Sequence, residues 1–160
     1  MGLAIRAHVI TVSDGVSAGV REDKSGDELA SILVGSGFAV GRSVVADEQS
    51  AILAAILDAA ANVRLVLTTG GTGFGPRDVT PEATDLALER QAPGVTHLMM
   101  ARGLESTPMA ALSRGRAGSI GDALVVNLPG SPTGAVESLQ AIIELIPHIL
   151  DLLTGDTEHR

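Results

Sequence analysis

The segment from Arg64 to Thr84, RLVLTTGGTGFGPRDVTPEAT, constrains the fold more than any other part of the chain. Its opening apolar run is too short for a helix and ends in glycines, which predicts a buried strand. Four glycines follow within six positions. Glycine accepts positive φ and lets a ligand approach backbone N–H groups. Pro81 suits the first turn of a helix, with Thr80 as its N-cap. The segment predicts a strand, a loop able to bind an anion, and a helix start.

The glycine loop lacks both common phosphate-binding signatures. It has no Gly-Lys-Ser/Thr ending, and no G-x-G-x-x-G that leads directly into a helix. Instead, Arg77 and Asp78 stand side by side at its far end, a cation that can pair with phosphate oxygens and an oxygen donor suited to magnesium. Glycine content alone is equally compatible with a tight turn whose Arg77 and Asp78 face water.

The rest of the chain alternates β-branched apolar runs with helical patterns. This alternation predicts one three-layer α/β domain over residues 1–155, with a mostly parallel sheet, and a polar tail at residues 156–160. Pro147 is expected to kink or interrupt the last helix. Strands are expected at residues 4–12, 38–46, 65–67 and 123–128; helices near 29–33 and at 50–61, 81–90, 95–103, 108–112 and 136–153; and loops at 16–25 and 113–118.

Four loops are expected at one edge of the predicted sheet, because each follows the carboxyl end of a strand. They are Ser13 to Gly15, Asp47-Glu48, Gly70 to Asp78, and Pro129 to Gly134. In open α/β sheets ligands bind outside these strand ends, so the convergence is a site hypothesis. Without further information, an acid such as Asp47 is as readily explained by a favourable place before a helix N-terminus.

A basic loop, SRGRAG at residues 113–118, is a second candidate for binding an anion. Arg114 and Arg116 could supply two guanidinium groups to phosphate from a flexible loop. The alternative is a solvated loop with no ligand.

Charge and composition exclude several classes of function. The net charge is −8 and the pI is near 4.8, so the long-range field would repel nucleic acid and anionic membranes. The chain has no cysteine, which excludes disulfides and thiolate metal sites. The N-terminus lacks a signal-peptide pattern, and no apolar run approaches the length that spans a bilayer. A cytoplasmic protein that binds neither nucleic acid nor membrane is expected.

The central string TTGGTGFGPRDVTPEAT resembles, nearly letter for letter, the signature of the MogA/MoaB family of molybdenum-cofactor biosynthesis proteins. Four further segments resemble family motifs in the family's order: SDGVSAGVREDKSGDEL, VVADE, TPMAALSRGRAG and NLPGSP. Together with the central string they cover most of the chain, so the resemblance to this family extends over most of its length.

The resemblance implies an Mg-ATP-dependent adenylylation of molybdopterin that yields adenylylated molybdopterin and pyrophosphate. It implies that Asp47 and Asp78 are catalytic and hold Mg²⁺. It also implies a homotrimer, or a hexamer, that hands its product to a MoeA-type protein. The residues expected to bind the pterin and the nucleotide are Ser13, Asp14, Thr69, Gly70, Gly71, Thr72, Gly73, Arg77, Ser113, Arg114, Pro129, Gly130, Ser131 and Pro132.

Three positions depart from the family pattern. Gly15 stands where many relatives carry a larger polar or basic residue, Asp27 replaces a frequent proline, and Gly103 stands where serine is common in some members. The first and third could weaken ligand contacts. The alternative function is therefore a paralogue that binds molybdopterin as a scaffold without turnover.

Overall fold

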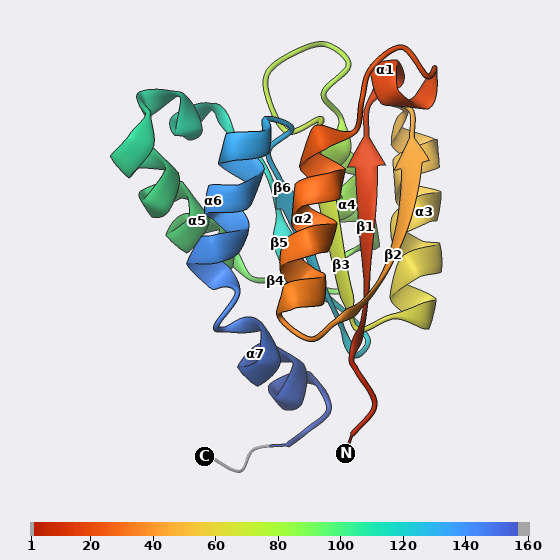
Figure 1. Ribbon diagram of the computed structural model, residues 1–160, viewed down its shortest axis with the longest axis vertical. Coiled ribbons are helices and arrows are strands. Elements are labelled where there is room, and N and C mark those ends of the chain that lie inside the picture. The colour runs from red at the N-terminus through yellow and green to blue at the C-terminus, as the bar shows by residue number, and fades with distance from the viewer. Residues whose placement is uncertain (1, 157–160) are drawn as a thin grey trace.

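The computed structural model describes residues 2–156, which fold into one six-stranded sheet between two layers of helices (Figure 1). The strand order is β2-β1-β3-β6-β5-β4. Four strands run parallel, while β5 and β4 are antiparallel to their neighbours at one edge. The predicted fold class is confirmed. The strands are β1 Arg6–Val12, β2 Ala39–Val45, β3 Leu65–Thr69, β4 Arg90–Gln91, β5 Ala117–Ile120 and β6 Ala123–Leu128.

Two hydrophobic clusters fix the layers, because side chains of a strand alternate between the faces of the sheet. Val9 faces a cluster with α2, α6 and α7, whereas its neighbour Ile10 faces a cluster with α3 and α4. Every residue of β3 and β6 is buried, as expected of strands covered on both faces. The helices are α1 Asp14–Ser17, α2 Lys24–Gly35, α3 Gln49–Asn62, α4 Thr80–Ala87, α5 Pro93–Ser106, the 3₁₀ helix η1 Pro108–Leu112, α6 Pro132–Ile142 and α7 Ile146–Leu153.

Sequence reasoning missed the antiparallel edge of the sheet. β5 lies where the sequence predicts the end of a loop, and β4 lies where it predicts the end of a helix. AGSI has little intrinsic strand character, and it forms β5 because β6 supplies a partner, Ala117 opposite Val126. The expected loop at residues 16–25 is also partly wrong, since α1 ends at Ser17 and α2 begins at Lys24.

Prolines set the limits of several helices. Pro93 occupies the first turn of α5, since a helical N-terminus requires no N–H there. Pro147 lies in the first turn of α7, and the chain between Ile142 and Ile146 separates α6 from α7. The predicted interruption of the last helix is confirmed. Asp156 is the only residue of the predicted polar tail 156–160 within the described part; the remainder lies outside it.

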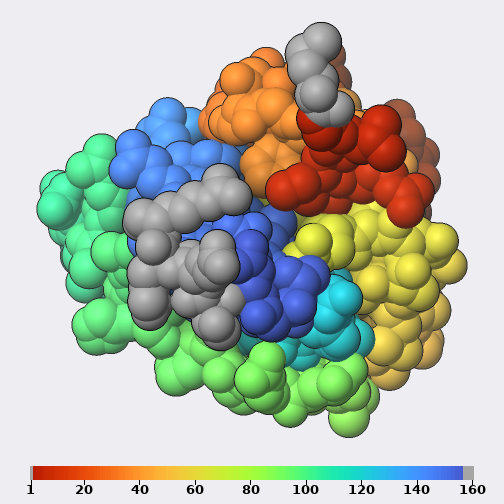
Figure 2. Space-filling model, turned by 90° about the horizontal axis from the view of Figure 1, so that it is seen from below, coloured from red at the N-terminus to blue at the C-terminus, as the bar shows by residue number. Residues whose placement is uncertain are grey.

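The end of the molecule opposite the four loops is formed in part by α7 and the turn between β5 and β6 (Figure 2). Arg64, which precedes β3, ties these two together. Its Nε donates to the carbonyl oxygen of Asp122 at 2.9 Å, and its Nη2 to that of Leu150 at 2.6 Å. Across residues 2–156, no helix has the length and apolar character needed to cross a membrane.

Candidate functional site

The four predicted loops meet at the carboxyl ends of β1, β2, β3 and β6. The loops after β1 and β2 are joined by Asp14 and Asp47, which exchange hydrogen bonds. The N–H of Asp14 donates to Asp47 Oδ2 at 2.9 Å, and the N–H of Asp47 donates to Asp14 Oδ1 at 3.0 Å. Ser13 caps α1, since its Oγ accepts from the N–H of Val16 at 3.2 Å. This pairing fixes the Asp47 carboxylate at the sheet edge.

The glycine loop begins in a conformation that side chains resist. Gly70 and Gly71 have φ values of 105° and 69°. The N–H of Gly70 donates to the carbonyl of Leu128 at 3.1 Å, so it belongs to the sheet and is not available to a ligand. Within residues 2–156, the N–H groups of Gly71, Thr72 and Gly73 have no protein acceptor. These three groups remain the candidates for cradling phosphate.

Thr80 and Thr69 hold the base of the glycine loop. The Thr80 hydroxyl donates to the carbonyl oxygen of Gly70 at 2.9 Å, and its N–H donates to that of Gly71 at 3.1 Å. Thr80 is therefore the first residue of α4, and the residue before it occupies the N-cap position, which corrects the predicted cap. The Thr69 hydroxyl donates to the carbonyl oxygen of Pro129 at 2.7 Å, joining the loops after β3 and β6.

Asp78 is enclosed by the glycine loop itself. Its Oδ2 accepts from the N–H of Gly75 at 2.9 Å, and its own N–H donates back to the carbonyl of Gly75 at 3.0 Å. A Cβ at Gly73 or Gly75 would lie 3.1 Å or 2.8 Å from Asp78 Oδ2. These two glycines are thus needed because the chain wraps closely around a carboxylate.

Arg77 makes a two-pronged contact with Asp14. Its Nε lies 2.7 Å from Asp14 Oδ2, and its Nη2 lies 3.0 Å from Oδ1. This hydrogen bonding, together with that from the N–H of Asp47, lowers the pKa of Asp14. The predicted contact between Arg77 and phosphate stays a prediction, and in the structure the guanidinium bridges the loops after β1 and β3.

The Asp47 carboxyl has a raised pKa. Partial burial is the main cause, and the charges of Asp14 and Asp78 add to it, against the lowering effect of the hydrogen bond from Asp14. Asp47 and Asp78 line the same cavity and repel one another. Carboxylate oxygens from two acids that line one cavity are hard donors of the kind that Mg²⁺ prefers. The residues present are therefore compatible with the expected metal.

Two cavities open at this edge of the sheet. The first, of about 400 Å³, is called here the methionine cavity because Met99, Met100 and Met109 line it. The second, of about 690 Å³, is called the polar cavity, and Arg21 and Lys24 line it beside the acids. The two share four lining residues, which are Gly71, Asp78, Gly130 and Ser131.

Most of the predicted site residues divide between these cavities, but Asp14, Arg77 and Arg114 line neither of them. Ser113 lines the methionine cavity, Asp47 lines the polar cavity, and Asp78 lines both. Of the other predicted residues, Ser13, Thr69, Gly70 and Pro132 line only the polar cavity, and Thr72, Gly73 and Pro129 only the methionine cavity.

Sequence reasoning did not single out the two cations of the polar cavity, which line it together with Glu22 and Asp23. Arg21 and Lys24 stand in a polar segment whose letters do not show which side chains face a ligand. Asp23 caps α2 by accepting from the N–H of Gly26 at 3.0 Å. Its other oxygen accepts from Thr11 at 2.8 Å and from Arg42 at 2.7 Å, so this acid is fully engaged.

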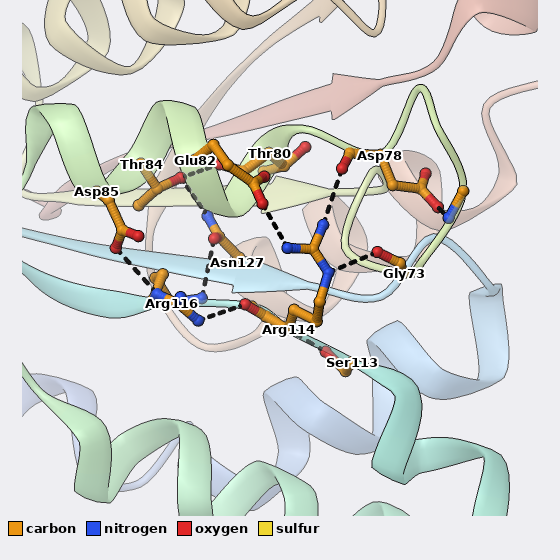
Figure 3. Close-up of polar contacts among 12 residues, drawn as sticks. Gly73, Asp78, Thr80, Glu82, Thr84, Asp85, Ser113, Arg114, Arg116 and Asn127 are labelled. Atoms are coloured by element: carbon orange, nitrogen blue, oxygen red, sulfur yellow. Dashed lines mark hydrogen bonds and ion pairs between the residues drawn. The ribbon is translucent and has the colours of Figure 1, made fainter.

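The predicted loop at residues 113–118 is a loop only as far as Arg116, because β5 begins at Ala117, and the side chains of Arg114 and Arg116 are bound to other parts of the protein (Figure 3). Arg116 pairs with Asp85 at 2.9 Å and donates to the carbonyl of Arg114 at 2.7 Å. All three guanidinium nitrogens of Arg114 also donate to protein acceptors. The Ser113 Oγ accepts from the N–H of Gly115 at 3.4 Å. The predicted contacts of Ser113 and Arg114 with a ligand stay predictions.

Beneath this segment lies buried Asn127, whose side-chain hydrogen-bonding groups are occupied (Figure 3). Its amide nitrogen donates to the hydroxyls of Thr68 and Thr84, each at 3.0 Å. Its amide oxygen accepts from the N–H of Arg116 at 2.9 Å. Asn127 thus ties β3, α4 and β6 together under the site.

Two departures from the family pattern have steric consequences. A Cβ at Gly103 would lie 2.8 Å from the Cβ of Ala110, so α5 and η1 approach too closely for serine at this position without a shift. A Cβ at Gly15 would meet that of Arg21 at 3.3 Å, which is tight but adjustable. Asp27, the third departure, pairs with Arg42 at 2.6 Å.

The fold and the loops at its sheet edge define a class: three-layer α/β domains that bind ligands at the carboxyl ends of parallel strands. Residues 8–148 match the family described as a probable molybdopterin binding domain. The chain belongs to this family. This confirms the resemblance read from the motifs.

Named relatives agree with this assignment. The molybdopterin adenylyltransferase of Helicobacter pylori (strain 26695) is 36% identical over 159 residues, covering 95% of this chain and 89% of that protein. The molybdenum cofactor synthesis protein cinnamon of Drosophila melanogaster is 41% identical over 154 residues, covering 92% of this chain but only 25% of that protein. The crystal structure of the molybdopterin biosynthesis enzyme MoaB from Thermus thermophilus has 46% identity and a TM-score of 0.88, covering 94% of this chain and 97% of that one.

Proposed function

We propose that this protein acts in molybdenum cofactor biosynthesis as a molybdopterin adenylyltransferase that uses Mg-ATP. The observation that carries the proposal is the pair of adjoining cavities, which share Asp78 and the glycine loop. Transfer between two substrates requires both reacting groups to be held at one point, and the shared wall supplies such a point. A near full-length relative named molybdopterin adenylyltransferase supports the same reaction.

In the proposed reaction, a phosphate oxygen of molybdopterin attacks the α-phosphorus of ATP. A new O–P bond forms, the bond to the bridging oxygen breaks, and pyrophosphate leaves. Such a transfer needs alignment and charge neutralisation more than covalent catalysis by the protein. The free N–H groups of Gly71, Thr72 and Gly73 can donate to phosphate oxygens at the shared wall. Arg21 and Lys24, which line the polar cavity, can donate to phosphate oxygens there.

Asp47 and Asp78 are the proposed metal ligands. Mg²⁺ held there would neutralise charge on phosphate oxygens and orient them. The hydrogen bond from Asp14 fixes one oxygen of Asp47, and that from Gly75 fixes one oxygen of Asp78. Both carboxylates are therefore prearranged by backbone donors before any ligand arrives.

We further place the protein in the cytoplasm as a homotrimer, or a hexamer, that hands adenylylated molybdopterin to a MoeA-type protein. These proposals follow from the resemblance described above. The longer relatives fit a hand-over, since the chain spans about half of a protein named molybdenum cofactor biosynthesis bifunctional protein from Chlorobaculum tepidum.

Mass spectrometry of purified protein incubated with molybdopterin and Mg-ATP tests the proposed activity. Wild type should form adenylylated molybdopterin and pyrophosphate, and Asp47→Asn and Asp78→Asn should form far less. Asp122→Asn is the matched control, because this exposed aspartate lies in the β5–β6 turn at the opposite end of the sheet. Wild-type protein that binds molybdopterin without forming adenylate would replace the enzyme with the scaffold alternative.

A further inference from the structure

Arg114 contacts both ends of residues 73–78, the second part of the glycine loop. Its Nε donates to the carbonyl of Gly73 at 2.8 Å, and its Nη2 donates to the carbonyl of Asp78 at 2.9 Å. Its own N–H donates to the carbonyl of Thr72 at 2.8 Å. The loop between residues 73 and 78 is therefore closed by one side chain that lies 36 or more positions further along the chain.

Two further contacts fix the guanidinium group. Nη1 pairs with the Glu82 carboxylate on α4, and this pairing lowers the pKa of Glu82. The Phe74 ring, at the exposed tip of the loop, lies with its centroid 5.7 Å from Arg114 Cζ. The bonds from the guanidinium to two carbonyls and a carboxylate are visible in Figure 3. With the ring contact they hold the side chain of Arg114, which is only 27% exposed.

Asp78 depends on the loop shape that these contacts maintain. Its carboxylate is oriented by the N–H of Gly75, and its main-chain carbonyl is one of the two that Arg114 binds. If the loop opened, the N–H of Gly75 would no longer lie within hydrogen-bonding distance of Oδ2. The guanidinium group is a planar fork with several N–H donors in fixed directions, so it can hold the loop closed by binding two carbonyls and a carboxylate at once.

We infer that Arg114 is a positioning residue for the proposed reaction: it closes the loop at residues 73–78 so that Asp78 stays at the wall shared by the two cavities. The catalytic consequence rests on the proposed function. The inference gives Arg114 a role different from its neighbour Ser113, whose side chain lies at the methionine cavity and does not touch the loop ends.

Three variants separate the contacts. Arg114→Met removes the fork but keeps an unbranched side chain. Arg114→Lys keeps the charge and can keep the pairing with Glu82, but a single ammonium cannot reproduce the fork. Arg116→Met is the matched control, because Arg116 also pairs with an acid on α4, while its guanidinium bonds to Asp85 and to the carbonyl of Arg114 instead of the loop at residues 73–78.

Two measurements need no turnover. Hydrogen exchange of the peptide covering residues 73–79 should accelerate in Arg114→Met and Arg114→Lys and stay near wild type in Arg116→Met. Mn²⁺, used as the paramagnetic probe of the metal site, should bind about 10–100-fold more weakly to both Arg114 variants, the range expected when a group that orients a metal ligand is lost. Electron paramagnetic resonance of free Mn²⁺ measures this affinity.

Activity adds a third readout. The Mg²⁺ concentration for half-maximal adenylylation should rise by about the same 10–100-fold factor, and the KM for molybdopterin should change less. Unchanged exchange in Arg114→Met would overturn the inference, and so would faster exchange with unchanged Mn²⁺ affinity. Wild-type protein without adenylylation would refute the proposed function alone, because exchange and Mn²⁺ binding would still decide the role of Arg114.

Discussion

Gly70→Ala should destabilise the protein strongly. A Cβ at this position would lie 2.3 Å from the carbonyl oxygen of Val12, a backbone atom that cannot rotate away. The φ of 105° is also a conformation that alanine resists. We expect about 1–3 kcal/mol from backbone strain and about 1–3 kcal/mol from the forced overlap, hence about 2–6 kcal/mol in total.

Thermal unfolding followed by circular dichroism measures this loss. At about 2–4 °C per kcal/mol for a chain of this size, Tm should fall by at least about 4 °C. Gly35→Ala is the matched control, because nothing lies within 4 Å of its Cβ and the residue ends α2 without a positive φ. That variant should be neutral or more stable by up to about 1 kcal/mol. A Tm of Gly70→Ala within about one degree of wild type would refute the steric reasoning.

Three further changes have outcomes of defined sign. Asp47→Asn should raise stability at pH 7, because burial raises the pKa of Asp47 and so penalises its charged form in the folded protein. The gain should vanish as pH falls through that raised pKa toward the ordinary value near 3.8, which a plot of Tm against pH would show. Asp14→Asn should do the opposite. The pKa of Asp14 is lowered, so the variant should be less stable than wild type at pH 7, and this deficit should disappear as pH falls through the lowered pKa. Identical pH profiles for the Asp47 and Asp14 variants would contradict both signs. Asn127→Ala should cost about 1–3 kcal/mol in urea unfolding, because the partly buried Arg116 N–H loses its acceptor and the buried Thr68 and Thr84 hydroxyls lose their donor. A loss under about 0.5 kcal/mol would show that the site readjusts.

The fold was largely predictable because its central strands and its glycine loop leave few alternatives. Leu65 to Leu67 is apolar without a break and leads into glycines, which fits only a strand covered on both faces. β5 was not predictable, since its small residues become a strand only beside β6. Leu57 shows the same limit: it is as apolar as its neighbours on α3, yet it is 45% exposed, whereas Ile52 and Ile56 are fully buried.

The site was predictable as a place but not as a set of contacts. The carboxyl ends of parallel strands bring Asp14 and Asp47 together wherever such a sheet forms. No local pattern shows that Arg77 binds Asp14, because 63 positions separate them. The pairing of Arg114 with loop carbonyls is equally remote in sequence. Side-chain partners of this kind depend on the final packing of the loops.

The two cavities have walls of unequal rigidity. β3 and β6, which support the wall shared by both, bury every residue. By contrast, α5 is 14 residues long and buries only Met99, and η1 buries none of its residues. Segments with few buried apolar contacts open locally at low free-energy cost. The methionine cavity therefore has a deformable outer wall, formed by α5 and η1, and a rigid wall supported by β3 and β6. Its shape can adapt to a bulky ligand while the shared wall keeps its geometry.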